Sequence, residues 1–119
     1  MSQETNYPEV MEKVKANMAV FGKAQPGVMA AFGKLHKEGS VDGALDEKAK
    51  ELIALAIAVA MRCDDCIAFH TYAVLKAGAS RAEVMDMLTV TVLMGGGPSM
   101  MYSTHVIDAM DQFEKKMAG

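Results

Sequence analysis

The chain has 119 residues and a formal net charge of −3, and 51% of its residues are hydrophobic. This suits a single domain over residues 1–119 with its own core. There is no basic stripe and only 6% of residues are aromatic, which argues against nucleic-acid binding. The longest apolar run, residues 52–61, is too short to span a bilayer, and residues 1–6 lack the pattern of a signal peptide. We therefore expect a soluble, cytoplasmic protein with no membrane partner.

Glycines and prolines divide the first half of the chain into amphipathic segments that we predict to be helices. The first runs over about 8–20, where apolar residues recur at helical spacing. The second begins at Pro26 and reaches the turn-rich segment 38–40. The third follows Asp46, which suits an N-cap, and ends near residue 61.

The second half of the chain predicts three more helices. The fourth covers about 64–77 and is followed by a glycine. Ser-Arg-Ala-Glu at 80–83 has the pattern of a capping box and predicts the start of a fifth. Gly-Gly-Gly-Pro at 95–98 then predicts a break before a sixth helix that ends near 116. Residues 87–94 have some strand propensity, but a lone strand would have no partner, so we favour helix.

These segments predict a compact all-α bundle of about six helices. Between residues 52 and 61 the third helix is apolar almost all round, which indicates burial on every side. A domain of this size has little room for such a helix unless another subunit covers it, so we predict a homo-oligomer. The twelve methionines fit the same picture, as adaptable packing residues rather than metal ligands.

The most informative segment contains two cysteines three positions apart, Cys63 and Cys66, followed by His70. In a reducing compartment a static structural disulfide is not expected, which favours a catalytic or metal-binding pair. A helix that starts near residue 64 places the cysteines at its first turn, where unpaired amides and the helix dipole favour a thiolate. His70 lies one turn beyond Cys66 on the same face and can act as its base or charged partner. These are the parts that thiol–disulfide or peroxide chemistry needs.

Charged neighbours act on the two thiols in opposite directions. Asp64 and Asp65 suit a helix N-terminus, but two carboxylates between the cysteines oppose thiolate formation. The cation of Arg62 offsets part of this repulsion.

Two other interpretations of the cysteine pair stay open: a zinc site, and a buried pair with no function. Zinc would need four ligands, and the chain has no second Cys-x-x-Cys. A c-type haem is excluded because Ile67 stands where its histidine would be. We interpret His36 and His105, which have no reactive neighbours in sequence, as structural or surface residues. The candidate zinc ligands are Cys63, Cys66, His70, Glu51, His36 and His105.

Glu51, Cys63, Cys66 and His70 have the spacing Glu-x11-Cys-x2-Cys-x3-His. This resembles the motif of the alkylhydroperoxidase D-like branch of the carboxymuconolactone decarboxylase family. The resemblance covers residues 45–93 well. It implies an all-helical fold that assembles as a homotrimer or homohexamer.

The resemblance also implies a role for each of these residues. Cys66 would attack peroxide, and Cys63 would resolve the sulfenic acid into a disulfide. His70 would take the proton of Cys66, with Glu51 acting behind it through water. The best-known peroxidase members carry a histidine just before the second cysteine, where this chain has Asp65.

The expected function is thus that of a thiol-dependent redox enzyme without a cofactor. It would be either a peroxidase for a small hydroperoxide or a reductase for a protein disulfide, regenerated by a dithiol or a thioredoxin-like protein. One alternative is a decarboxylase-like enzyme that uses Arg62 and His70, although the name-giving decarboxylases lack the cysteine pair. Another is a metal-binding or structural oligomer built on Cys63, Cys66 and His70.

Overall fold

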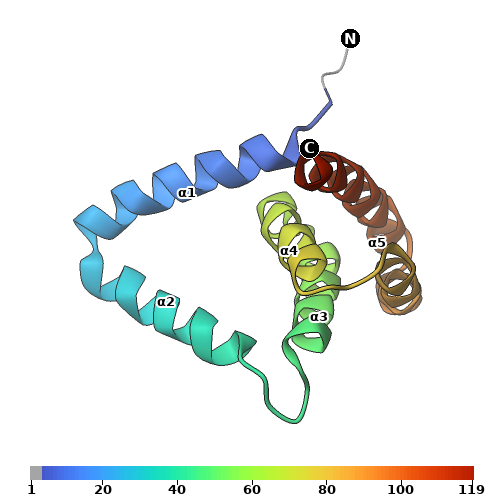
Figure 1. The fold of residues 1–119 in the computed structure, drawn as a ribbon, viewed down its shortest axis with the longest axis horizontal. Helices are drawn as coiled ribbons and strands as arrows, with labels where there is room; N and C mark the ends of the chain where they lie inside the picture. Colours follow the sequence, from blue (N-terminus) through green and yellow to red (C-terminus); the bar gives the residue numbers. More distant parts are fainter. Residues whose placement is uncertain (1–3) are drawn as a thin grey trace.

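The computed structural model describes residues 4–119, which form helices joined by short turns (Figure 1). This confirms the predicted all-α class, but residues 4–119 contain five helices where the sequence predicted six. The helices are α1 (Tyr7–Ala24), α2 (Pro26–Ser40), α3 (Glu47–Ala60), α4 (Asp64–Lys76) and α5 (Arg81–Ala118).

The difference in number arises in α5, which runs through the predicted glycine–proline break. The backbone leaves helical geometry at Gly96, with φ 68° and ψ −147°, a conformation that glycine adopts at little steric cost. Pro98 lies just beyond, where its missing N–H is tolerated because the helix restarts there. Glycine and proline therefore interrupt the helix at the predicted place, but it resumes at once, so α5 is one kinked element rather than two helices. Residues 87–94 are helical, as predicted.

Side-chain oxygen atoms cap the beginnings of α1, α3 and α5. Asn6 accepts a hydrogen bond from the amide of Glu9 at the start of α1, and Asp46 accepts one from the amide of Ala49 at the start of α3. The predicted capping box at the start of α5 is present, with Ser80 and Glu83 each bonding to the other's amide.

The core lies between α3, α4 and α5, which pack on one another. Of α1, only the beginning is buried, through Tyr7, Pro8 and Met11. The largest fully buried apolar side chains of the core are Leu55, Val59, Ile67, Val74, Val84, Val106, Met110 and Phe113.

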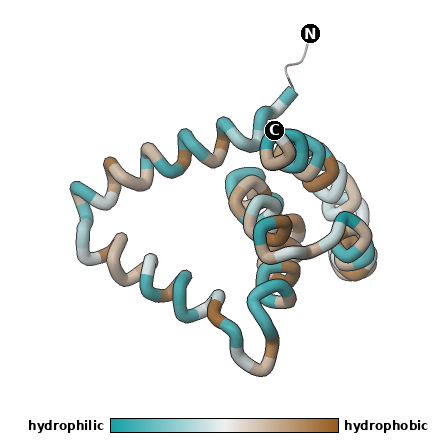
Figure 2. The backbone as a smooth tube through the Cα atoms, viewed as in Figure 1, coloured by the Kyte–Doolittle hydropathy of each residue, from teal (hydrophilic) through white to brown (hydrophobic). Residues whose placement is uncertain are grey.

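The hairpin formed by α1 and α2 extends away from this core (Figure 1). No residue of α2 is buried, although Figure 2 shows hydrophobic positions along both helices. Its exposed side chains include Val28, Phe32 and Leu35. None of the described helices is long and apolar enough to cross a membrane.

Within the single chain α3 is covered on one side only, so the predicted burial on every side would require another subunit and stays a prediction. Leu55 and Val59 are fully buried, but Ile53, Ile57 and Met61 are 47%, 52% and 73% exposed. The reason is that α4 and α5 cover one side of α3, while α2 touches it only lightly. An apolar strip along α3 therefore faces outward.

Candidate functional site

The turn between α3 and α4 places the first cysteine. Arg62 has a left-handed backbone, with φ 56°. The amide of Arg62 donates a hydrogen bond to the carbonyl of Val59, and the amide of Cys63 donates one to the carbonyl of Ala58. Together these two bonds form the Schellman motif that ends a helix. Cys63 is thus held at the end of α3. This turn could not be predicted from the residues, because the left-handed position is usually a glycine.

Cys63 is also the N-cap of α4. Its sulfur accepts a hydrogen bond from the amide of Cys66 at 3.2 Å, in the place where a serine or aspartate oxygen usually stands. The two half-buried cysteines form a disulfide, with their Cα atoms 5.2 Å apart. The two thiols therefore lie close enough to form and break a bond at the start of a helix.

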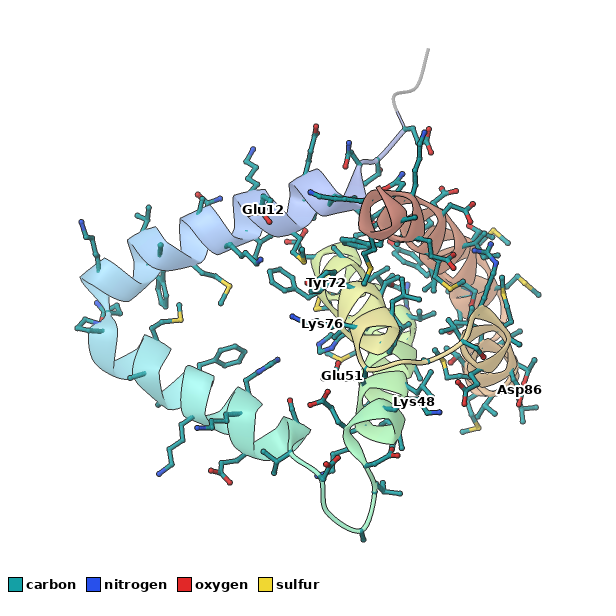
Figure 3. The ribbon with its side chains drawn as sticks, in the orientation of Figure 1. Glu12, Lys48, Glu51, Tyr72, Lys76 and Asp86 are labelled. Carbon is teal, nitrogen blue, oxygen red and sulfur yellow. A yellow bond between two sulfur atoms is a disulfide. The ribbon has the colours of Figure 1, made fainter. Side chains whose placement is uncertain are left out.

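Behind the cysteines, a carboxylate and an imidazole meet between α3 and α4. Glu51 Oε2 lies 2.8 Å from Nδ1 of His70, and the Glu51 side chain is only 8% exposed. The contact is direct, whereas the resemblance implied a water between the two. When Glu51 is ionised it accepts the Nδ1 proton, which leaves Nε2 of His70 as a proton acceptor. In Figure 3, Glu51 lies where α3 and α4 face the α1–α2 hairpin.

A pocket of about 420 Å³ opens between the hairpin and the start of α4. Its α4 wall carries Asp65, Cys66 and His70, so the second cysteine, unlike the first, lines the pocket. The hairpin wall is mostly apolar and makes most of the cavity hydrophobic. The remaining lining residues are Val14, Met18, Met29, Phe32, Gly33, His36 and Phe69.

His36 is a surface residue, as interpreted from the sequence, but it also lies at the pocket. Its side chain is exposed on one side but lines the pocket on the other, and its ring stacks near that of His70 with centroids 6.4 Å apart. Sequence spacing could not reveal this neighbour, because α2 and α4 are brought together only by the hairpin.

His105 lies in a second polar cluster, on the side of α4 that faces α1 and α5. Asp64 Oδ1 accepts hydrogen bonds from the Tyr7 hydroxyl at 2.9 Å and from Nδ1 of His105 at 2.7 Å. Burial raises the pKa of Tyr7 above its ordinary value, and the hydrogen bond to Asp64 raises it further. Of the two carboxylates between the cysteines, Asp64 is therefore held by this cluster, while Asp65 faces the pocket.

The zinc alternative has no cluster to support it in the part of the chain that the structure describes. Across residues 4–119, no three side chains of His, Cys, Asp or Glu are grouped as a metal site requires. The sulfur atoms of the two most suitable ligands, Cys63 and Cys66, are joined to each other.

Comparison with known proteins gives a consistent family. Residues 26–109 match the model of the carboxymuconolactone decarboxylase family. An uncharacterised protein from Cupriavidus necator is 38% identical over 101 residues, which cover 85% of this chain and 89% of that protein. Another, from the cox locus of Paracoccus denitrificans, is 29% identical over 87% of this chain and 94% of its own length.

Two solved structures share the fold. The apo form of a carboxymuconolactone decarboxylase family protein from Legionella pneumophila matches with a TM-score of 0.88 and 40% identity, covering 90% of this chain and 96% of that one. A family member from Thermotoga maritima matches with a TM-score of 0.77 and 26% identity, over 88% of this chain and 92% of that one. The description of the Thermotoga protein suggests a part in antioxidative response.

Proposed function

This chain belongs to the carboxymuconolactone decarboxylase family, and on that premise we propose that it is a thiol-dependent enzyme that reduces hydroperoxides. One observation carries the proposal: Cys66 of the disulfide and His70, which is bonded to the buried Glu51, line the wall of the same pocket. A redox-active thiol pair, an oriented base and a space for substrate are the parts that such a reaction requires.

Cys66 is the attacking thiol in this proposal, for two reasons. It lines the pocket together with His70, whereas Cys63 does not. It also occupies the third position of α4, where the helix dipole and free amides stabilise a thiolate. His70, with Nδ1 held by Glu51, accepts the thiol proton at Nε2.

Cys63 is the resolving thiol. Attack of the Cys66 thiolate on the peroxide gives a sulfenic acid and an alcohol, and Cys63 then displaces the hydroxyl group to form the disulfide and water. A dithiol or a thioredoxin-like protein returns the two electrons. We further propose that the protein works in the cytoplasm as a homotrimer or homohexamer, in which the exposed apolar strip of α3 is covered.

Asp65 favours a second candidate function, the reduction of a protein disulfide. Its exposed carboxylate lies beside Cys66 and faces the pocket. The negative charge of Asp65 disfavours the Cys66 thiolate, but it would attract a basic partner protein that carries the disulfide. This function predicts slow reaction with peroxide and fast exchange with a disulfide on a basic peptide.

The test is a titration of thiols before and after one equivalent of an organic hydroperoxide is added to the reduced protein, without reductant. The proposal predicts loss of both thiols and a mass lower by two hydrogens. Cys66→Ser should not react at all, while Cys63→Ser should react once and leave a sulfenic acid that dimedone traps. Wild-type thiols that stay free would overturn the peroxidase proposal and favour the disulfide reductase.

A further inference from the structure

We propose that His36, on α2, is a second catalytic histidine, which gives a proton to the oxygen that leaves when Cys66 attacks a hydroperoxide. This inference rests on the proposed function. It assigns separate tasks to two imidazoles at one pocket: His70 removes the proton of the thiol, and His36 supplies a proton to the leaving group.

The position of His36 is the first argument. His36, Asp65, Cys66 and His70 all line the same pocket, so a molecule that fills it and reaches the Cys66 sulfur lies against both imidazoles. The rings are 29° from parallel with centroids 6.4 Å apart, which leaves them neighbours without a direct hydrogen bond. Among residues 4–119, the His36 ring makes no hydrogen bond to another side chain, so its nitrogens are free for a ligand.

The different partners of the two histidines are the second argument. Glu51 lies 2.8 Å from His70 and stabilises the imidazolium that forms when His70 takes a proton. The carboxylate thus orients His70 with Nε2 as the proton acceptor. Within the described residues 4–119, His36 has no carboxylate at hydrogen-bond distance, so neither of its nitrogens is held by a side chain and either can face the leaving oxygen.

The other walls of the pocket place no competing acid there. The lining residues from α1 are Val14 and Met18, neither of which titrates. From α4, Asp65 is the remaining lining group with an ionisable side chain besides the thiol and His70. An ionised carboxylate accepts hydrogen bonds and donates none.

The Cys66 thiolate attacks the terminal oxygen of ROOH, so that an S–O bond forms, the O–O bond breaks and sulfur is oxidised by two electrons to the sulfenic acid. The departing alkoxide RO⁻ takes a proton from His36 and leaves as ROH. His36 regains its proton from solvent, to which its outer side is exposed.

The test compares two peroxides that differ in their need for this proton. An alkyl hydroperoxide expels a strongly basic alkoxide, while a peroxycarboxylic acid expels a carboxylate that needs no proton. The measurement is the single-turnover rate of sulfenate formation on Cys63→Ser protein, with and without the added His36→Gln substitution. His36→Gln should lower the rate with the alkyl hydroperoxide on the order of 10²-fold. The rate with the peroxy acid should stay nearly unchanged.

A matched control is Lys37→Gln, on the next residue of α2, which is exposed and does not line the pocket. It should leave both rates unchanged. An equal loss with both peroxides in His36→Gln, or no loss with either, would overturn the assignment of His36 while the peroxidase itself stands. A parent protein inert to both peroxides would overturn the peroxidase proposal and the role of His36 together.

Discussion

Glu51 Oε2 and His70 Nδ1 lie 2.8 Å apart, although the two residues are 19 positions apart and belong to different helices. The carboxylate is almost inaccessible to water, while the imidazole extends from it to the pocket that Cys66 lines. A buried carboxylate needs such a partner, and the partner in turn has its orientation and proton position fixed.

Replacing the buried carboxylate should therefore slow catalysis more than it harms folding. Glu51→Gln keeps the shape of the side chain but no longer stabilises a protonated His70, so sulfenate formation should fall on the order of 10²-fold. The control is Glu47→Gln, one turn earlier on α3 and exposed, which should react like wild type. The rate of sulfenate formation with an alkyl hydroperoxide is measured by stopped flow in both variants. Equal rates in the two variants would show that Glu51 takes no part in the mechanism.

The two carboxylates between the cysteines should have unequal effects on the Cys66 thiolate. Asp65 faces the pocket, while Asp64 is bonded to Tyr7 and His105. Asp65→Asn removes a repulsion of about 1 kcal/mol and should increase the thiolate fraction at neutral pH about fivefold.

Asp64→Asn is the matched comparison, and it should change the thiolate fraction much less. The measurement is the pH dependence of alkylation of reduced Cys63→Ser protein by iodoacetamide. A larger increase with Asp64→Asn than with Asp65→Asn would contradict the structural distinction between the two carboxylates.

Tyr7 should make the stability of the fold sensitive to alkaline pH. Burial and the hydrogen bond to Asp64 raise its pKa above the ordinary value of 10.0, so the folded protein keeps the proton that the unfolded chain loses. Above pH 10 the folded state therefore keeps more protons bound than the unfolded state does. The free energy of unfolding then decreases as the pH rises further. Below that pH the stabilisation is fully present.

Tyr7→Phe removes this titration and one hydrogen bond. Urea unfolding near neutral pH should show a loss of about 1 kcal/mol. Between about pH 9 and about pH 11 the variant should lose less stability than wild type, because this phenol no longer titrates. Parallel pH profiles for the two proteins would show that Tyr7 has its ordinary pKa.

The kink in α5 predicts opposite outcomes for two adjacent glycines. Gly96 has φ 68° and ψ −147°, which an alanine adopts only with strain, so Gly96→Ala should cost about 1–3 kcal/mol. Gly97 has no positive φ and open space around its Cα, so Gly97→Ala should be neutral or stabilise the helix by up to about 1 kcal/mol. Thermal unfolding compares them; a stabilised Gly96→Ala would mean that the kink is absent in solution.

Features encoded within a few residues could be read from the sequence. Asp46 and Ser80 cap their helices because an N-cap needs only a short side chain and the next turn of backbone. The closeness of Cys63 and Cys66 likewise follows from their spacing at a helix start. Local composition also placed the interruption at residues 95–98, where the backbone leaves helical geometry at Gly96, but it did not show that the helix would resume at once.

Contacts between helices could not be read in this way. The spacing of Glu51 and His70 matched a family motif, but only the packing of α3 on α4 brings their side chains together. His36 lies farther away in sequence and reaches the site through the hairpin, whose geometry no periodicity specifies. The sequence predicted that this chain alone would not cover all of α3, but uniform apolarity does not say which side of the helix stays exposed.

Cys63 has two structural tasks: its amide completes the turn that ends α3, and its sulfur caps the beginning of α4. Both tasks survive reduction, since the first uses its amide and a free thiolate accepts the cap bond at least as well as a disulfide sulfur. On the proposed function, the disulfide would therefore be reduced and re-formed without loss of the turn that ends α3 or of the cap that begins α4. A protein that signals its oxidation state needs a shape that changes with it; this arrangement instead suits repeated turnover, because little has to be rebuilt between one cycle and the next.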